Sequence, residues 1–180
     1  DAGYGLIFAG LTLLARAKWG RRYGDALNLV LILSLGAVVW GALSGTWFGL
    51  DKKQLPELMR GLPWLDNMQN VQWLCFLIAG VHLSVAHLWK ALATINSLVC
   101  LAQVGWTTII WGNFFMAAQL IAGRAYQPLM LWLYGIGIGL VILFTAPSRN
   151  VFKTLVTGVV TIINPSGGAI SSFGDLLSYI

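Results

Sequence analysis

Asp175 is the residue whose type and surroundings point most directly to chemistry, because it lies in an apolar stretch near the end of the chain. An ionised carboxylate inside a membrane helix costs roughly 2.5–3.5 kcal/mol, so such residues usually face a bundle interior or an aqueous cavity and mark ion pathways. We therefore predict that Asp175 belongs to an ion pathway. The alternative is a place near the membrane interface or at a helix N-terminus, since Ser171 and Ser172 closely precede it.

Two histidines, His82 and His87, lie five residues apart in another apolar stretch. Five residues on a helix correspond to about 140° around the axis, so the two rings should not converge on one metal ion. Histidine titrates near neutral pH, which is compatible with a role in a proton path. Hydrogen-bonded packing is the alternative for each ring.

No catalytic constellation is visible in the sequence. A phosphate loop, a Ser/His/Asp set and paired carboxylates are all missing, and the six acidic residues are spread over 180 positions. Cys75 and Cys100 lack the spacing of a zinc site or disulfide framework, and we expect both simply to pack. We therefore expect a non-catalytic chain without a metal or a cofactor.

The composition indicates which elements position these residues. The chain is 58% hydrophobic and 9% charged, whereas soluble domains carry about 25% charged residues. The stretch 26–50 contains no charge, and a membrane span needs roughly 20 such residues. These features predict an all-α, polytopic transmembrane helical bundle. The net charge of +5 is scattered between apolar runs, so we interpret it as setting topology and not as nucleic-acid binding.

We expect about five to six membrane segments, the last of them truncated. The first is too short to span alone, a polar stretch with Pro56, Gly61 and Pro63 follows the second, and a bend near Asn96 precedes the fourth. Both ends look cut from a longer protein. The expected segments are 3–15, 26–50, 71–89, 104–122 and 128–146, followed by a short helix at 154–163 and a truncated helix at 171–180.

Orientation follows from the positions of lysine and arginine. If the segments alternate, seven basic residues gather on one side and four on the other. The more basic side should be cytoplasmic. This places the basic turns 16–22, 90 and 149–153 in the cytoplasm and the loop 51–70 on the opposite side, most simply in a prokaryotic plasma membrane.

Glycine spacing suggests close helix packing. Small residues four positions apart form a ridge on which another helix can approach. Such a ridge is expected in the second segment and again in the fifth, and the residues concerned are Gly41, Gly45, Gly49, Gly135 and Gly139.

Several stretches together resemble the membrane domain of the V/A-type rotary ATPase stator subunit, called subunit a or I. The opening Asp1-Ala2-Gly3-Tyr4-Gly5 is similar to the family's Gly-Asp-x-Gly-(Tyr/His)-Gly turn, and residues 41–49 resemble its next, glycine-ridged helix. Val81-His82 and Gly105-Trp106 match shorter signatures. The end of the chain matches most specifically, with Gly174-Asp175-Leu176-Leu177-Ser178-Tyr179-Ile180 resembling the prokaryotic branch.

The resemblance implies a mechanism and partners. In the family, a rotor ring of small carboxylate-bearing membrane subunits turns against the stator subunit, which offers two aqueous half-channels for protons or sodium. An arginine between them would be the residue just beyond Ile180. The resemblance adds Ser178 and Tyr179 to the pathway residues Asp175, His82 and His87. It also implies peripheral-stalk and central-stalk partners in a lipid bilayer, with ATP chemistry in partner subunits.

Two other classes of function remain open at this level. A self-contained transporter or channel would need polar residues that converge within these spans, which hold few beyond His82, His87 and Asn113. A structural membrane anchor would need only the glycine ridges.

Overall fold

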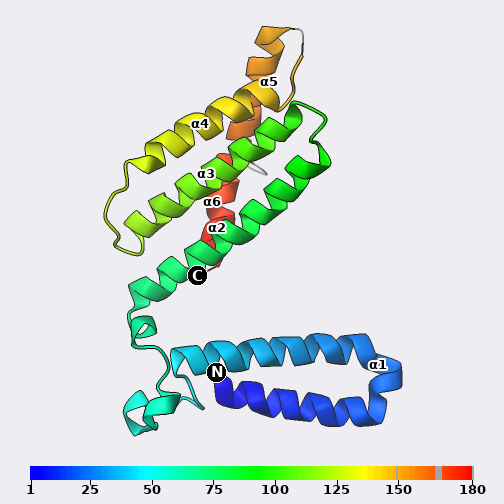
Figure 1. Cartoon of the computed structure of the whole chain (residues 1–180), viewed down its shortest axis with the longest axis vertical. Helices are drawn as coiled ribbons and strands as arrows, with labels where there is room; N and C mark the ends of the chain where they lie inside the picture. The colour runs from blue at the N-terminus through cyan, green and yellow to red at the C-terminus, as the bar shows by residue number, and fades with distance from the viewer. Residues whose placement is uncertain (149, 165–167, 180) are drawn as a thin grey trace. The chain divides into compact units, whose positions relative to one another are not determined.

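The computed structural model describes residues 1–148, 150–164 and 168–179. Three parts lie outside this description: Arg149 of the expected basic turn, residues 165–167 between the expected helices 154–163 and 171–180, and Ile180. The chain divides into two units, residues 1–68 and 69–180, and each is described by itself. Every regular element in the described ranges is an α-helix or a short 3-10 helix (Figure 1), which confirms the predicted all-α class.

Three helices have the length and composition needed to cross a membrane. They are Arg22–Ser44, Met68–Ala93 and Val99–Leu120, and two shorter apolar helices follow at Leu129–Phe144 and Val151–Ile163. The polytopic membrane class expected from the apolar runs is therefore confirmed.

The first unit is built on a helical hairpin, α1 (Ala2–Ser44), which bends back on itself at Tyr23. The first arm begins at Asp1, whose carboxylate accepts a hydrogen bond from the Gly3 amide at 2.8 Å. That arm continues through residues 16–22, where a turn was expected. Lysine and arginine are good helix formers, and their long side chains can carry the charge outward while the backbone stays helical.

The second arm ends at Ser44, before the expected end at residue 50. Gly45 adopts a left-handed conformation with φ 67°, and the Thr46 amide donates to the Gly41 carbonyl at 2.8 Å. Phe48 and Gly49 also have positive φ. Although the run stays uncharged to residue 50, a left-handed glycine terminates a helix by satisfying its last carbonyls.

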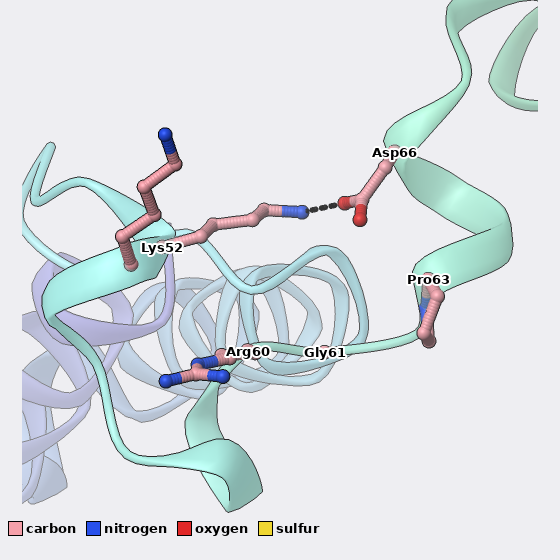
Figure 2. Close-up of a pocket in the computed structure, with 6 residues that line it drawn as sticks. Lys52, Arg60, Gly61, Pro63 and Asp66 are labelled. Atoms are coloured by element: carbon pink, nitrogen blue, oxygen red, sulfur yellow. Dashed lines mark hydrogen bonds and ion pairs between the residues drawn. The ribbon is translucent and has the colours of Figure 1, made fainter.

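The polar stretch that follows contains three 3-10 turns, η1 (Lys52–Gln54), η2 (Glu57–Met59) and η3 (Pro63–Asp66). Its backbone returns to the end of α1, where the Leu62 amide donates to the Leu43 carbonyl at 2.7 Å. Figure 2 shows Lys52 reaching across a hollow to form an ion pair with Asp66. The hollow has a volume of about 280 Å³ and is lined by Lys52, Lys53, Arg60, Gly61, Pro63 and Asp66.

The second unit consists of α2 (Met68–Ala93), α3 (Val99–Leu120), α4 (Leu129–Phe144), α5 (Val151–Ile163) and α6 (Ala169–Leu177). The turn between α2 and α3 includes the expected bend at Asn96. Helix α3 is central, because its buried residues contribute to two apolar clusters. One cluster joins α2, α3 and α6 through Phe76, Phe114 and Leu176.

Candidate functional site

Three of the predicted pathway residues lie in or directly after helix α6: Asp175 is within it, and Ser178 and Tyr179 follow its last residue. An apolar contact holds this helix in place. Leu176 is fully buried against Phe76 of α2 and Phe114 of α3. Because neighbouring positions on a helix point about 100° apart, burying Leu176 turns Asp175 toward a different side. Asp175 and Ser178 are both exposed.

His82 and Tyr179 are brought together although 97 residues separate them. The Nδ1 atom of His82 lies 2.5 Å from the hydroxyl of Tyr179, and the two rings meet edge to face with centroids 6.0 Å apart. The imidazole tautomer decides which of the two atoms donates the proton. The structure therefore joins two predicted pathway residues in one hydrogen bond between α2 and the end of α6.

Asp175 precedes Tyr179 by four residues, a spacing that places two side chains about one helical turn apart on the same side. Its carboxylate makes no hydrogen bond or ion pair with the residues the structure describes. The Ser178 hydroxyl donates to the backbone carbonyl of Asp175 at 2.6 Å. At the neighbouring Gly174, a built Cβ would meet nothing within 4 Å among the described residues of this unit.

His87 has different neighbours. Its Nδ1 lies 3.0 Å from Oε1 of Gln103, and its ring stacks on Trp106 at 6.2 Å between centroids. The two histidines thus reach different helices, α6 and α3, as their 140° separation on α2 requires. The structure does not bring His87 to the α6 site.

A cavity of about 270 Å³ lies beside His87. Lys90 and Thr145 both line it, so the α2–α3 turn and the end of α4 lie at the same end of the second unit. Arg124 lies at the opposite end of the unit, near the start of α2, where it donates to Asn70 at 2.6 Å. The complete lining is His87, Lys90, Val99, Ala102, Gln103, Trp106, Thr145 and Thr161.

A buried polar bridge joins α4, α3 and α6, and sequence reasoning missed its role. Asn113 is 2% exposed. Its Oδ1 accepts from the Tyr134 hydroxyl at 2.7 Å, and its Nδ2 donates to Ser172 Oγ at 2.9 Å. An amide inside a long uncharged run is itself a signal, because a polar group at that depth needs partners. Its partners lie far along the chain, where spacing cannot point to them.

Of the expected glycine ridge Gly41, Gly45 and Gly49, only Gly41 lies within helix α1. A Cβ at Gly41 would overlap the backbone at Ala2, so this residue permits close approach of the two arms. Gly45 and Gly49 lie beyond the helix end. A Cβ at Gly45 would overlap the Arg60 carbonyl, whereas Gly49 is open. Gly45 therefore makes room for the returning loop backbone and not for a second helix.

In α4 the closest helix contact is made at Gly137. A Cβ there would lie 2.5 Å from Thr108 Oγ1 and 2.8 Å from the Gly105 carbonyl of α3. Gly135 and Gly139 have nothing within 4 Å of a built Cβ among the described residues. Their predicted packing role stays a prediction.

The fold and these contacts define a polytopic helical membrane protein with polar side chains gathered around a short amphipathic helix. Over its whole length the chain is similar to V-type ATP synthase subunit I of Borreliella burgdorferi, with 29% identity, covering 32% of that protein. It is also similar to V-type ATP synthase subunit I 1 of Treponema pallidum, with 28% identity, covering 31% of it. The chain thus spans about a third of the length of these curated relatives.

These similarities confirm the resemblance to V-type subunit I that the sequence motifs predicted. Together with the three long apolar helices, they indicate an integral membrane protein. No family model matches the chain, and no solved structure matches it.

Proposed function

We propose that this chain is the membrane part of a non-catalytic stator subunit of a V-type rotary ATPase, in which α6 and α2 line a half-channel for protons or sodium ions. The observation that carries the proposal is the hydrogen bond between His82 and Tyr179, with the uncovered carboxylate of Asp175 about one turn away. An imidazole, a phenol and a carboxylate along one seam can each exchange or attract a cation.

The exposure of Asp175 supports this assignment. A carboxylate facing lipid hydrocarbon would cost roughly 2.5–3.5 kcal/mol, whereas one facing water in a half-channel keeps its hydration. Asp175 is exposed within the second unit. The rotor ring, the peripheral stalk and the central stalk are the proposed partners, and ATP turnover belongs to other subunits.

The test uses Asp175→Asn in the complete ATPase reconstituted in vesicles. ATP-driven ion pumping should slow, while assembly and the ATP hydrolysis of the detached head stay unchanged. Asp25→Asn is the matched control, because Asp25 is also an exposed carboxylate but lies beside the α1 turn. Unchanged pumping in Asp175→Asn would remove Asp175 from the pathway.

A second variant tests the hydrogen bond itself. Tyr179→Phe keeps the aromatic ring next to His82 but removes the hydroxyl, so pumping should fall while the packing of α6 stays intact. Ion flux through the full-length subunit without a rotor ring would instead favour a self-contained transporter.

A further inference from the structure

The α1 turn, residues 16–25 at the end of the hairpin where its two arms meet, concentrates positive charge at one end of the membrane helix Arg22–Ser44. Residues 16–25 contain four cations, Arg16, Lys18, Arg21 and Arg22, and one carboxylate, Asp25. Among the described side chains, Arg16, Lys18 and Arg22 form no ion pair with a carboxylate. Arg16 donates to the neutral amide of Asn28 at 2.5 Å, which ties the two arms together and leaves the charge uncompensated.

The opposite end of the hairpin is electrically different. Helix Arg22–Ser44 has 23 residues, which at about 1.5 Å per residue is close to the thickness of the hydrocarbon core. The segment beyond it, residues 51–66, carries three cations and three carboxylates, and Lys52 is paired with Asp66 (Figure 2). The positive field is therefore confined to one membrane surface.

Aromatic side chains fix the depth of this charge. Trp19 and Tyr23 are about half exposed at the turn, and such amphipathic rings settle at the level of lipid headgroups. The Lys18 ammonium lies 5.2 Å from the Trp19 ring centroid, and the Arg22 guanidinium lies 5.4 Å from that of Tyr23. Each cation is thus held against a ring at headgroup depth.

The turn is also hollowed. One cavity of about 580 Å³ is lined by Arg16, Ala17, Lys18, Gly20 and Gly24. A second, of about 430 Å³, shares Gly20 and Gly24 and adds Arg22, Tyr23, Asp25 and Ala26. The two linings together therefore carry three cations, Arg16, Lys18 and Arg22, against one carboxylate, Asp25. Because the shared glycines have no side chains, a headgroup can approach the backbone between the flanking cations.

We infer that the α1 turn binds the headgroup of an anionic phospholipid, with Lys18 and Arg22 contacting its phosphate. The chemistry recognised is a phosphate diester with net negative charge, presented by the lipid leaflet into which Trp19 and Tyr23 insert. This site is separate from the residues of the proposed ion pathway, and it does not depend on the proposed function.

The experiment measures lipid selectivity at the turn in the full-length protein reconstituted in vesicles. Cys75 and Cys100 are replaced, and a single cysteine at Leu14 carries a fluorophore, because Leu14 is 70% exposed, lies about one helical turn before Lys18 and lines neither cavity. Vesicles of phosphatidylcholine receive a small fraction of brominated phosphatidylglycerol or, in the parallel sample, brominated phosphatidylcholine. Brominated phosphatidylglycerol should quench the label well beyond its mole fraction, and brominated phosphatidylcholine only in proportion.

Charge-removing variants decide the outcome. Lys18→Gln/Arg22→Gln should reduce the preference for phosphatidylglycerol by about five-fold for each cation lost. The charge-keeping pair Lys18→Arg/Arg22→Lys should retain it, and Lys52→Gln/Lys53→Gln at the opposite end should leave it unchanged. Equal quenching by both lipids, or full preference in the doubly neutralised variant, overturns the inference. Displacement by inorganic phosphate, but not by chloride at matched ionic strength, identifies a site for soluble phosphate and overturns it as well.

Discussion

Replacing Asn113 by leucine removes both hydrogen bonds that its amide makes between helices of the second unit. The side chain is 2% exposed, and leucine has a similar size, so the change acts mainly on hydrogen bonding and leaves little cavity. Ser172 keeps a partner, because its hydroxyl still donates to the Ala169 carbonyl at 2.9 Å. Tyr134 keeps only a weak contact with Met116 Sδ at 3.8 Å.

The magnitude follows from these partners. Hydrogen bonds between membrane helices average about 0.6 kcal/mol and reach about 1.7 kcal/mol. Two such bonds predict a loss of about 1–3 kcal/mol in Asn113→Leu. Tyr134→Phe removes one bond and should cost about 0.6–1.7 kcal/mol. Both single variants remove the hydrogen bond between Tyr134 and Asn113, and in the double variant no Tyr134 hydroxyl is left without this partner. The combined loss should therefore fall short of the sum of the single losses by about 0.5 kcal/mol or more.

The assay is reversible unfolding of the full-length subunit in bilayers, followed by steric trapping, for both single variants and the double variant. Thr107→Val is the matched control, because among the described residues the Thr107 hydroxyl bonds only the Gln103 carbonyl of its own helix, at 3.1 Å. Its stability should stay within about 0.5 kcal/mol of the parent. Losses that add within about 0.3 kcal/mol would refute the coupling between Tyr134 and Asn113.

Three further predictions concern packing and orientation. Alanine at Gly137 should be less stable than alanine at Gly139 by about 1–3 kcal/mol, because only at Gly137 does the new methyl overlap α3; equal thermal stabilities would contradict this. Alanine at Gly45 should destabilise the protein more than alanine at Gly49. At both positions alanine would have to adopt a left-handed backbone, which costs about 1–2 kcal/mol, but only at Gly45 does the new methyl group overlap the loop backbone. A larger loss at Gly49 would disprove this contact. A single cysteine at Gln54 should react with an impermeant reagent in intact cells, and reaction only in inside-out vesicles would reverse the predicted orientation.

The helices could be predicted from sequence because their apolar runs are long, whereas their ends depend on subtler terms. The run to Leu50 is uncharged, yet the helix stops at Ser44 because Gly45 turns left-handed. In the first arm of α1, the basic residues from Arg16 to Arg22 continue the helix, where their charge alone suggested a turn. Hydropathy reports where a chain can be buried, and backbone conformation decides where a helix ends.

The faces of the helices could not be predicted, because they are set by partners far along the chain. Of three alternating glycines in α4, only Gly137 meets α3, since the approach is fixed by Gly105 and Thr108. Residue chemistry nominated His82 and the family resemblance nominated Tyr179, but their hydrogen bond depends on the packing of α6 against α2. In the sequence Asn113 is an isolated polar residue, and only the fold brings Tyr134 and Ser172 within hydrogen-bond distance of it.

Three contacts set the rotation of α6, and together they determine what Asp175 can face. Leu176 is buried, Ser172 accepts from Asn113, and Tyr179 meets His82. Turning the helix by about 100°, one residue position, would bury a carboxylate in place of leucine and break both polar contacts. The outward position of Asp175 is therefore enforced by packing. If Asp175 lines the proposed half-channel, Asn113→Leu should slow pumping without touching the pathway, and the slowing should scale with the loss of stability across the Asn113 and Tyr134 variants.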